Sequence, residues 1–347
     1  MITEFTFGIV TYNSERTVVE TLESIKYQIE HFGNGIVSYL VLSDDCSTDR
    51  TLYIVREWLK NNNTLFRETS ILTATYNSGL CVNYAQMVCH IKTEHFIQIA
   101  GDDLISSENI YEKLSTLGEN ELRVHLTLKF CGTSISNDPK DLRRQLFYSK
   151  YKHTNRRDIV LLETLSPYST VEICLFKKHY SDACMEYIKN YRNFEDDTSL
   201  YYVLKNNQDV TFRFVMTPII LYRREEKSLT KMVDTTSQIA FLDDLYRFRK
   251  ETFKREKNIF VKILLGLMLW DNFLMKHRFD ASKCLDRKIK RLIEQRNDIN
   301  IKKNKELSEY LAMYNKTIKR ETDYLKEIQN YAIDFLKNSA FEKQMET

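Results

Sequence analysis

The stretch Phe96-Ile-Gln-Ile-Ala-Gly-Asp-Asp-Leu-Ile105 decides the fold. Its apolar run is typical of a buried strand, which ends at Gly101 and presents Asp102 and Asp103 where the chain leaves the sheet. In open α/β sheets ligands bind beyond the carboxyl ends of the strands, and carboxylates there suit Mg²⁺ or Mn²⁺ held together with substrate phosphates. An isolated Gly-Asp-Asp is more often a solvated turn, so the sequence around it must decide between the two readings.

Three units of strand, polar turn and helix precede this stretch. Apolar runs at residues 5–11, 38–42 and 69–73 are each followed by a polar turn and then by apolar residues at helical spacing. The turns are Tyr12-Asn13-Ser14-Glu15, Ser43-Asp44-Asp45-Cys46-Ser47-Thr48-Asp49 and Tyr76-Asn77-Ser78-Gly79. The alternation predicts an α/β fold in which a mostly parallel sheet is wound with helices and polar loops gather at one edge.

Beyond residue 105 the pattern is less regular. It predicts a helix over residues 108–117 and strands at 124–130, 171–176, 210–215 and 219–222. The polar residues 134–156 predict a loop that could receive an acceptor. Three acids, Glu195-Asp196-Asp197, stand at the start of an apolar helix, where the helix dipole favours acids whatever their function.

Composition limits the class of protein. The 347 residues suit two domains or one large one, with 43% hydrophobic and 29% charged residues as in an ordinary globular chain. A net charge of +3 argues against a nucleic-acid partner bound by neutralising many phosphates. Seven cysteines without a C-x-x-C pair indicate a reducing compartment, and the acidic N-terminus does not look like a signal peptide, so we expect a cytoplasmic protein.

Four motifs taken in order carry a family resemblance. Val10-Thr11-Tyr12-Asn13, the turn at residues 43–49, Asn77-Ser78-Gly79 and Ala100-Gly101-Asp102-Asp103 resemble the inverting family 2 glycosyltransferases of GT-A fold, over about residues 3–230. The resemblance implies a hexosyl- or N-acetylhexosaminyltransferase. Such an enzyme would move one sugar from a nucleotide-sugar, expected to be a UDP-sugar, to a hydroxyl of a glycan acceptor. Capsule or other cell-surface polysaccharide or glycoconjugate biosynthesis would be its setting, with a lipid-linked acceptor as one class.

The resemblance also implies roles for individual residues. Tyr12 would stack on the uracil, Asp45 would accept a hydrogen bond from its N3–H, and Mn²⁺ or Mg²⁺ would bind at Asp102 and Asp103, with Asp103 preferred as the direct ligand. The whole donor-binding set is Thr11, Tyr12, Asn13, Glu15, Asp44, Asp45, Asn77, Gly79, Asp102 and Arg223. The general base would be Asp197 by register against the helix, or Asp196 by a literal match to the family's Glu-Asp pair, and both stay open.

The sequence departs from the family pattern in places. Ala100 stands where the D-x-D motif often has an acid, and Tyr84-Ala85 stands where many members carry Arg-Asn, so we expect altered base and pyrophosphate contacts. The Q-x-x-R-W signature of processive synthases is absent, which predicts addition of a single sugar. Arg223 lies where a basic residue can help hold pyrophosphate, while a surface pairing of Arg223 and Arg224 with nearby acids remains the alternative.

We expect residues 1–230 to form the catalytic domain, with a nucleotide-sugar half at about 1–105 and an acceptor half at about 106–230, and residues 231–347 to form a helical domain. Residues 303–338 carry a heptad seam broken by Glu321, which predicts a coiled coil. The preceding helices or the same helix of another subunit could cover this seam, and its length favours a homo-oligomer.

The apolar segment 259–274 is too short, and is interrupted by Lys262 and Asp271, to predict a membrane span. A buried core helix is the first interpretation, and a helix lying on the inner face of the plasma membrane is the second. Two other functions compete with sugar transfer. One is a non-catalytic GT-A-like scaffold that binds partners, and the other is a sugar-phosphate nucleotidyltransferase, for which the Gly-rich basic loop is lacking.

Overall fold

The computed structural model describes residues 2–136, 172–174, 177–193, 195–207, 209–224, 236–276 and 306–338. Its centre is a four-stranded sheet in the order β3-β2-β1-β4, with all neighbouring strands parallel. The strands are β1 (Glu4–Thr11), β2 (Val37–Asp44), β3 (Glu68–Thr73) and β4 (Phe96–Ala100). The predicted parallel sheet is therefore confirmed, including the strand that leads to Gly101.

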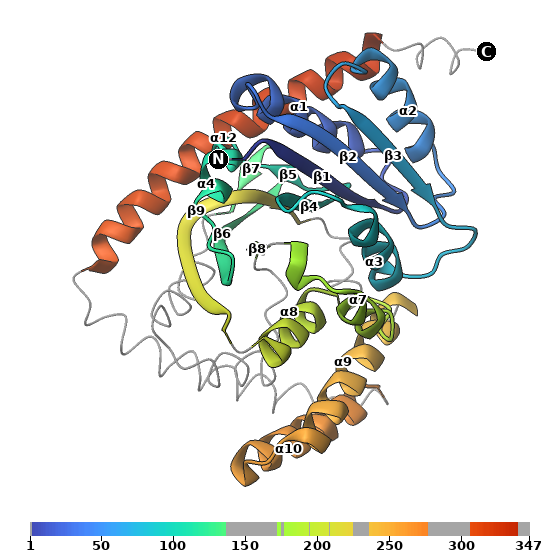
Figure 1. The fold of residues 1–347 in the computed structure, drawn as a ribbon, viewed down its shortest axis with the longest axis vertical. Coiled ribbons are helices and arrows are strands. Elements are labelled where there is room, and N and C mark those ends of the chain that lie inside the picture. Colours follow the sequence, from blue (N-terminus) through green and yellow to red (C-terminus); the bar gives the residue numbers. More distant parts are fainter. Residues whose placement is uncertain are drawn as a thin grey trace.

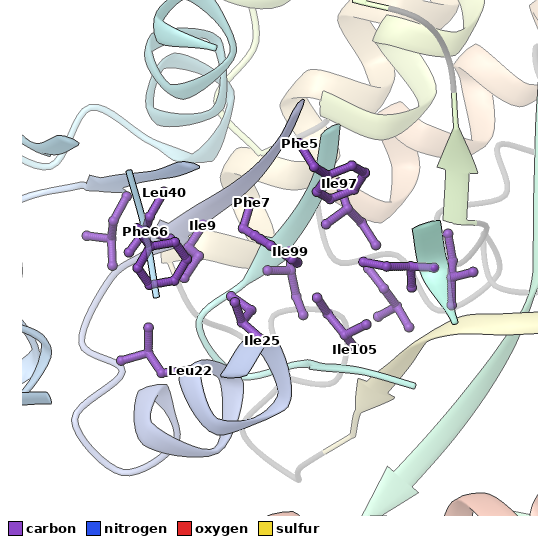
Figure 2. Packing of buried hydrophobic residues seen from close by; sticks show 14 of the residues in the cluster. Phe5, Phe7, Ile9, Leu22, Ile25, Leu40, Phe66, Ile97, Ile99 and Ile105 are labelled. Atoms are coloured by element: carbon purple, nitrogen blue, oxygen red, sulfur yellow. The ribbon is translucent and has the colours of Figure 1, made fainter. Parts of the chain in front are cut away.

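Strand β1 lies in the middle of this sheet and is covered on both faces. Phe5, Phe7 and Ile9 point to one side, where they pack with Leu22, Ile25 and Ile99 (Figure 2). On the other side Gly8 leaves room for the thioether of Met87, because a Cβ at this position would lie 2.8 Å from the sulfur. Burial on both faces explains why the parallel strands read as apolar runs.

Helices cover the two faces of the sheet (Figure 1). On the Phe5 side lie α1 (Val18–Phe32), α2 (Thr51–Asn61) and α4 (Ile110–Ser115), which share one hydrophobic cluster with β1. On the other side α3 (Leu80–His90) packs with α7 (Asp182–Ile188) and α8 (Glu195–Asn206) in a second cluster. A 3-10 turn, η2 (Lys177–His179), precedes α7.

A second sheet continues the domain in the order β5-β9-β6-β7. Its strands are β5 (Leu104–Ile105), β6 (Glu121–Cys131), β7 (Ser134–Ile135) and β9 (Thr211–Arg223), and β8 (Glu172–Cys174) pairs with β6. The two strands predicted at 210–215 and 219–222 are one strand, β9, whose register against β6 shifts near Pro218. Proline lacks the N–H that a regular ladder needs, which accounts for the irregularity there.

The C-terminal helices do not form the separate coiled coil that the heptad seam predicts. Helices α9 (Thr236–Arg255) and α10 (Ile259–Lys276) pack on each other, with α9 also joined to α7 and α8 through the second cluster. Helix α12 (Glu306–Asn338) returns along α1 and the second sheet (Figure 1). No helix among the described residues combines the length and apolar character needed to cross a bilayer.

The seam of α12 packs on the chain's own N-terminal domain, a partner that the sequence pattern did not suggest. Leu325 and Ile328 are fully buried beside Leu104 and Leu221 of the second sheet, and Ala332 joins the cluster of β1 and α1. The sequence pattern revealed a covered face but not its partner, because the partner lies about 200 residues earlier in the chain. Burial of these residues needs no contact between two copies of the chain.

Glu321, which interrupts the seam, fastens the helix. Its carboxylate accepts hydrogen bonds from the backbone N–H of Ser107 at 2.9 Å and from the Ser107 hydroxyl at 2.7 Å, and it pairs with Arg320 at 2.7 Å. Three residues on, the buried Tyr324 hydroxyl donates to the carbonyl of Ile105 at 2.9 Å. A buried carboxylate without such donors would be costly, so Glu321 fixes the position of α12 along the domain.

We expect Glu321→Ala to lower the free energy of unfolding by about 2–3 kcal/mol, because the Ser107 N–H and hydroxyl lose their acceptor, while Arg320 keeps its pair with Glu108. Urea denaturation checks this. The control is Glu327→Ala on the exposed side of the same helix, which removes the hydrogen bond from the Tyr331 hydroxyl. Glu321→Gln, which retains an acceptor, should recover part of the loss. Equal stability of the Glu321→Ala and Glu327→Ala variants would contradict the role given to Glu321.

Candidate active site

Four loops meet at the carboxyl edge of the first sheet. Val10 of β1 pairs with Ala100 of β4, and Thr11 pairs with Asp44 of β2, so these strands end side by side. The loops that follow at residues 11–15, 44–49, 77–79 and 101–103 contain all the predicted donor-binding residues except Arg223, which ends β9. The structure therefore brings together the motifs that the sequence places about 30 residues apart.

Asp44 and Asp49 join the loop after β2 to the loop after β1. The Asp44 carboxylate accepts from the Thr11 hydroxyl at 2.8 Å and from the Ser47 hydroxyl and N–H at 2.6 and 2.8 Å. Asp49 accepts from the Glu15 N–H at 3.1 Å and caps the first turn of α2 through Thr51. Both acids therefore serve to brace the loops against each other.

Asp45 fixes the third loop in the same way. Its carboxylate accepts from the Ser78 N–H and hydroxyl at 2.7 and 2.8 Å, and from the Gly79 N–H at 2.8 Å. Gly79 has φ +96°, and a Cβ there would lie 2.5 Å from Cγ of Arg192, so the loop requires glycine. The predicted bond from Asp45 to a uracil N3–H would use the lone pairs that these three bonds leave free.

Two non-glycine residues in the described chain have left-handed backbone, and both lie in these loops. They are Asn13, with φ 51°, and Cys46, with φ 62°. The Asn13 N–H donates to the Ser47 hydroxyl and its side-chain oxygen accepts from the Thr48 N–H, each at 2.8 Å. Such strain persists only where surrounding bonds impose it, and it is concentrated at functional sites.

The Gly101-Asp102-Asp103 turn separates its two acids. Asp102 is exposed at the sheet edge, whereas Asp103 is buried and one of its carboxylate oxygens accepts from the backbone N–H of Arg223 at 2.7 Å. Gly101 is required because a Cβ would lie 2.7 Å from Cγ2 of Thr11. The geometry thus favours Asp102 for contact with a bound cation, the reverse of the preference stated from the sequence.

Arg223 is part of the support of this turn. Its guanidinium donates to the carbonyl of Asp102 at 2.6 Å, pairs with Glu20 of α1 at 2.6 Å, and lies over the ring of Phe130. The side chain is only 6% exposed. Neither interpretation from the sequence, a pyrophosphate contact or a surface pair with the following acids, describes this arrangement. The neighbouring Arg224 is the exposed cation at this end of β9.

Two tyrosines project from the edge formed by these loops. Tyr12 is 48% exposed and Tyr76 is 69% exposed. Exposed aromatic rings beside polar loops offer stacking surfaces for a planar base, as predicted for Tyr12. Tyr76 was not singled out from the sequence, although its place in the turn before Asn77 was visible there.

Asn83 and Tyr84 were also not assigned roles. The Asn83 side chain is buried and donates to the carbonyls of Thr11 and Ser43 at 3.3 and 3.0 Å, so it holds the ends of β1 and β2. Tyr84 lies in the core, and its hydroxyl donates to Gln98 at 2.5 Å. The signal for Asn83 was a single amide on the otherwise apolar face of its helix.

The acidic turn begins α8, a helix that packs with α3 in the second cluster. Asp196 and Asp197 are in the first turn of this helix, as predicted, and their side chains are outside the described residues. The segment before them is held at two points. The Arg192 carbonyl accepts from the Cys81 N–H at 2.9 Å, and the Arg192 guanidinium donates to the Asn77 side chain.

Asp244 of α9 also holds this segment. Its carboxylate accepts from the backbone N–H groups of Arg192 and Asn193 at 2.8 and 2.7 Å. Burial raises the pKa of Asp244, while these two donors act against that shift. A helix from the C-terminal region therefore positions the chain that enters the acidic turn.

The described residues at this edge offer few ligands for a cation. Among the described residues no group of three His, Cys, Asp or Glu side chains is close enough to hold an ion. One exposed carboxylate, Asp102, stands at a strand end, where Mg²⁺ usually binds one or two carboxylates together with substrate phosphates.

Comparison with known proteins identifies the domain that carries this edge. Residues 6–170 match the model of glycosyl transferase family 2. This part of the chain belongs to that family. The chain is a glycosyltransferase, and its parallel sheet with helices on both faces is the GT-A-like fold that the four motifs predict. The acidic turn of α8 lies beyond the matched residues. No curated protein matches the sequence.

Solved structures of TarS from S. aureus resemble the fold of this glycosyltransferase. TarS 1-349 in complex with UDP-GlcNAc has 16% identity and a TM-score of 0.51, over 94% of this chain and 90% of that chain. A longer TarS structure has 17% identity and a TM-score of 0.49, over 94% of this chain. The glycosyltransferase described here spans 55% of that longer chain. At these identities the likeness extends to the fold alone.

We expect Asp244→Ala to loosen the segment that leads into α8, because two backbone N–H groups lose a charged acceptor. Amide hydrogen exchange of the glycosyltransferase at residues 190–200 should accelerate about tenfold or more, which corresponds to the loss of one hydrogen bond to a charged group. Asp243→Ala, which removes the neighbouring acid of the same helix, is the matched control. Unchanged exchange in Asp244→Ala would remove α9 from the support of the acidic turn.

Proposed function

We propose that the protein is an inverting, metal-dependent glycosyltransferase that moves one sugar from a UDP-sugar to a hydroxyl of a glycan acceptor. The observation that carries the proposal is the braced carboxyl edge. There the exposed Tyr12 and the exposed Asp102 follow neighbouring strands and stand where a nucleotide diphosphate would lie. Ligands of open α/β sheets bind at such an edge.

The donor class is supported by the loops and by the related fold. Rigid loops whose polar groups are already satisfied by one another leave the aromatic face of Tyr12 and the edge of the Asp45 loop for a base. TarS has been solved with UDP and with UDP-GlcNAc. We therefore propose UDP-GlcNAc as the first donor to test, with other UDP-hexoses as the alternatives.

Asp102 would hold the cation, with the buried Asp103 keeping the turn in place. Mn²⁺ or Mg²⁺ held by this carboxylate would supply Lewis-acid stabilisation of the departing nucleotide. Asp103 instead orders the end of β9 by accepting from the Arg223 N–H. The two adjacent acids would thus have different tasks, one toward the donor and one toward the fold.

Asp197 or Asp196 would take the proton of the acceptor hydroxyl. As the acceptor oxygen bonds to the anomeric carbon from the face opposite the diphosphate, the anomeric C–O bond to phosphate breaks and its electron pair leaves with the nucleotide. The proton passes to the carboxylate. General-base help of this kind is worth about 10²–10⁴-fold in rate. The fixed entry to α8, through Arg192 and Asp244, supports this assignment.

The acceptor is the second substrate of the proposed transfer. A hydroxyl of capsule or other cell-surface polysaccharide is the class we propose, and a lipid-linked acceptor is consistent with it. The segment 134–156, expected from the sequence to form an acceptor loop, lies outside the described residues beyond Ser136.

The donor and the cation are tested together by the release of nucleotide from a panel of UDP-sugars. With Mn²⁺ we expect slow release from one sugar, lost with chelator and lowered about hundredfold or more in Asp102→Asn. Asp103→Asn should chiefly lower the melting temperature, because its acceptor role toward Arg223 is structural. Release that persists at the same rate in chelator would rule out metal dependence.

The base is tested in the same assay with water as the acceptor. Asp197→Asn should retain binding of the UDP-sugar, measured by calorimetry, and lose release by about 10²–10⁴-fold. Asp196→Asn is the matched control, one residue away with the same change of charge. The reverse result would assign the base to Asp196, and full activity in both variants would exclude this turn from proton transfer.

A further inference from the structure

The outer face of α10 is apolar throughout. Every exposed side chain among residues 259–273 of this helix is hydrophobic, and four of these seven side chains are more than half exposed. They are Ile259, Phe260, Ile263, Leu264, Leu267, Trp270 and Phe273. Trp270 and Phe273 stack on each other with ring centroids 5.7 Å apart. Soluble proteins rarely leave a contiguous apolar surface of this kind without a partner.

The polar residues of α10 point the other way. Asp271 and Asn272 are buried against α9, where the Asn272 side chain accepts from the guanidinium of the buried Arg249 at 2.5 Å. Val261, Leu265 and Met268 complete the contact with α9. The helix thus has its polar groups inside and its largest apolar groups outside, which reverses the pattern of a helix on a soluble domain.

Cations adjoin this apolar face. Between residues 246 and 258 every exposed residue is basic, and Lys254, Arg255 and Lys257 lie where α9 turns into α10, next to the exposed Ile259 and Phe260. Both acids of this segment have partners within it. Glu251 pairs with Arg255 at 2.7 Å, and the Glu256 carboxylate accepts a hydrogen bond from the Asn258 N–H at 2.6 Å. Figure 1 shows α9 and α10 projecting away from the four-stranded sheet, so this surface lies apart from the donor edge.

We propose that the outer face of α10 docks on an anionic lipid bilayer. Trp and Phe side chains at the surface with lysines beside them match the chemistry of an interfacial helix, in which apolar groups enter the acyl boundary and cations meet the acidic headgroups. The charge complementarity of Lys254, Arg255 and Lys257 selects a lipid surface over a second copy of the chain, which would bring the same cations. This surface would hold the enzyme where a lipid-linked acceptor is found.

The chain contains its own reporter for this contact. It has two tryptophans, of which Trp58 is fully buried and Trp270 is 60% exposed. Addition of vesicles of phosphatidylcholine and phosphatidylglycerol should therefore shift the emission of the full-length protein to shorter wavelength, through Trp270 alone. Trp270→Phe keeps the apolar face, so it should still sediment with the vesicles but show no shift.

Substitutions test the face directly. Phe260→Gln with Ile263→Gln should weaken sedimentation with vesicles about tenfold or more, because two buried apolar groups are lost from the lipid. Ile333→Gln, at an exposed isoleucine of α12, is the matched control and should bind as the parent protein does. Lys254→Gln with Lys257→Gln should lower affinity for anionic vesicles about fivefold per lysine and leave binding to phosphatidylcholine alone unchanged.

Release of nucleotide from the donor should be the same in all of these variants, because α10 does not contribute to the donor edge. Absence of binding to anionic vesicles would overturn the proposal, as would equal binding by the parent and the Phe260→Gln, Ile263→Gln variant. Two results in lipid-free protein would also overturn it. The first is a dimer of the parent protein, seen by sedimentation equilibrium, that is absent in the Phe260→Gln, Ile263→Gln variant. The second is protection of Trp270 from quenching by acrylamide, which would show that the chain itself covers the face.

Discussion

The site depends on the ion pair between the buried Arg223 and the largely buried Glu20. This pair joins the end of β9 to α1, while the Arg223 backbone binds Asp103 and its guanidinium binds the Asp102 carbonyl. The two sheets therefore meet at the turn that presents Asp102. Burying two charges costs solvation energy, so such a pair is poor evidence for stability but strongly selects one arrangement of its partners. Gln329 of α12 also donates to Glu20 at 3.2 Å, which brings the C-terminal helix to the same point.

Hydrogen bonds between loops give the donor edge its rigidity. Asp44, Asp45 and Asp49 each accept from a loop other than their own, and Asn83 binds the carbonyls at the ends of β1 and β2. Acids used in this way are satisfied before any ligand arrives, and their positions need no rearrangement when a donor binds. A pre-organised edge lowers the entropy that binding would otherwise lose. It also explains why left-handed backbone at Asn13 and Cys46 is tolerated.

The sequence was sufficient for the parallel sheet and for the gathering of the four motifs, because both follow from local patterns. Apolar runs ending in polar turns predicted β1, β2 and β4 and placed their loops at one edge. The roles of neighbouring acids could not be predicted in this way. Asp102 and Asp103 differ only in which one turns toward β9, and that depends on a strand that begins at Thr211, more than 100 residues later. The partner of α12 was hidden for the same reason, since heptad spacing reports that a face is covered without reporting what covers it.

The C-terminal helices extend the family 2 domain at two places that matter for its chemistry. Helix α12 fastens to the loop that follows β5 through Glu321 and Ser107, on the side of Glu20 and Arg223. Helix α9 holds the entry to α8 through Asp244, on the side of the acidic turn. The donor side is thus braced by many hydrogen bonds among its own loops, whereas the segment that enters the acidic turn is held by the bonds of Arg192 to Cys81 and Asn77 and by the Asp244 carboxylate. Because fewer described bonds hold this segment than hold the donor loops, a change at α9 should move the acidic turn before it alters the donor edge.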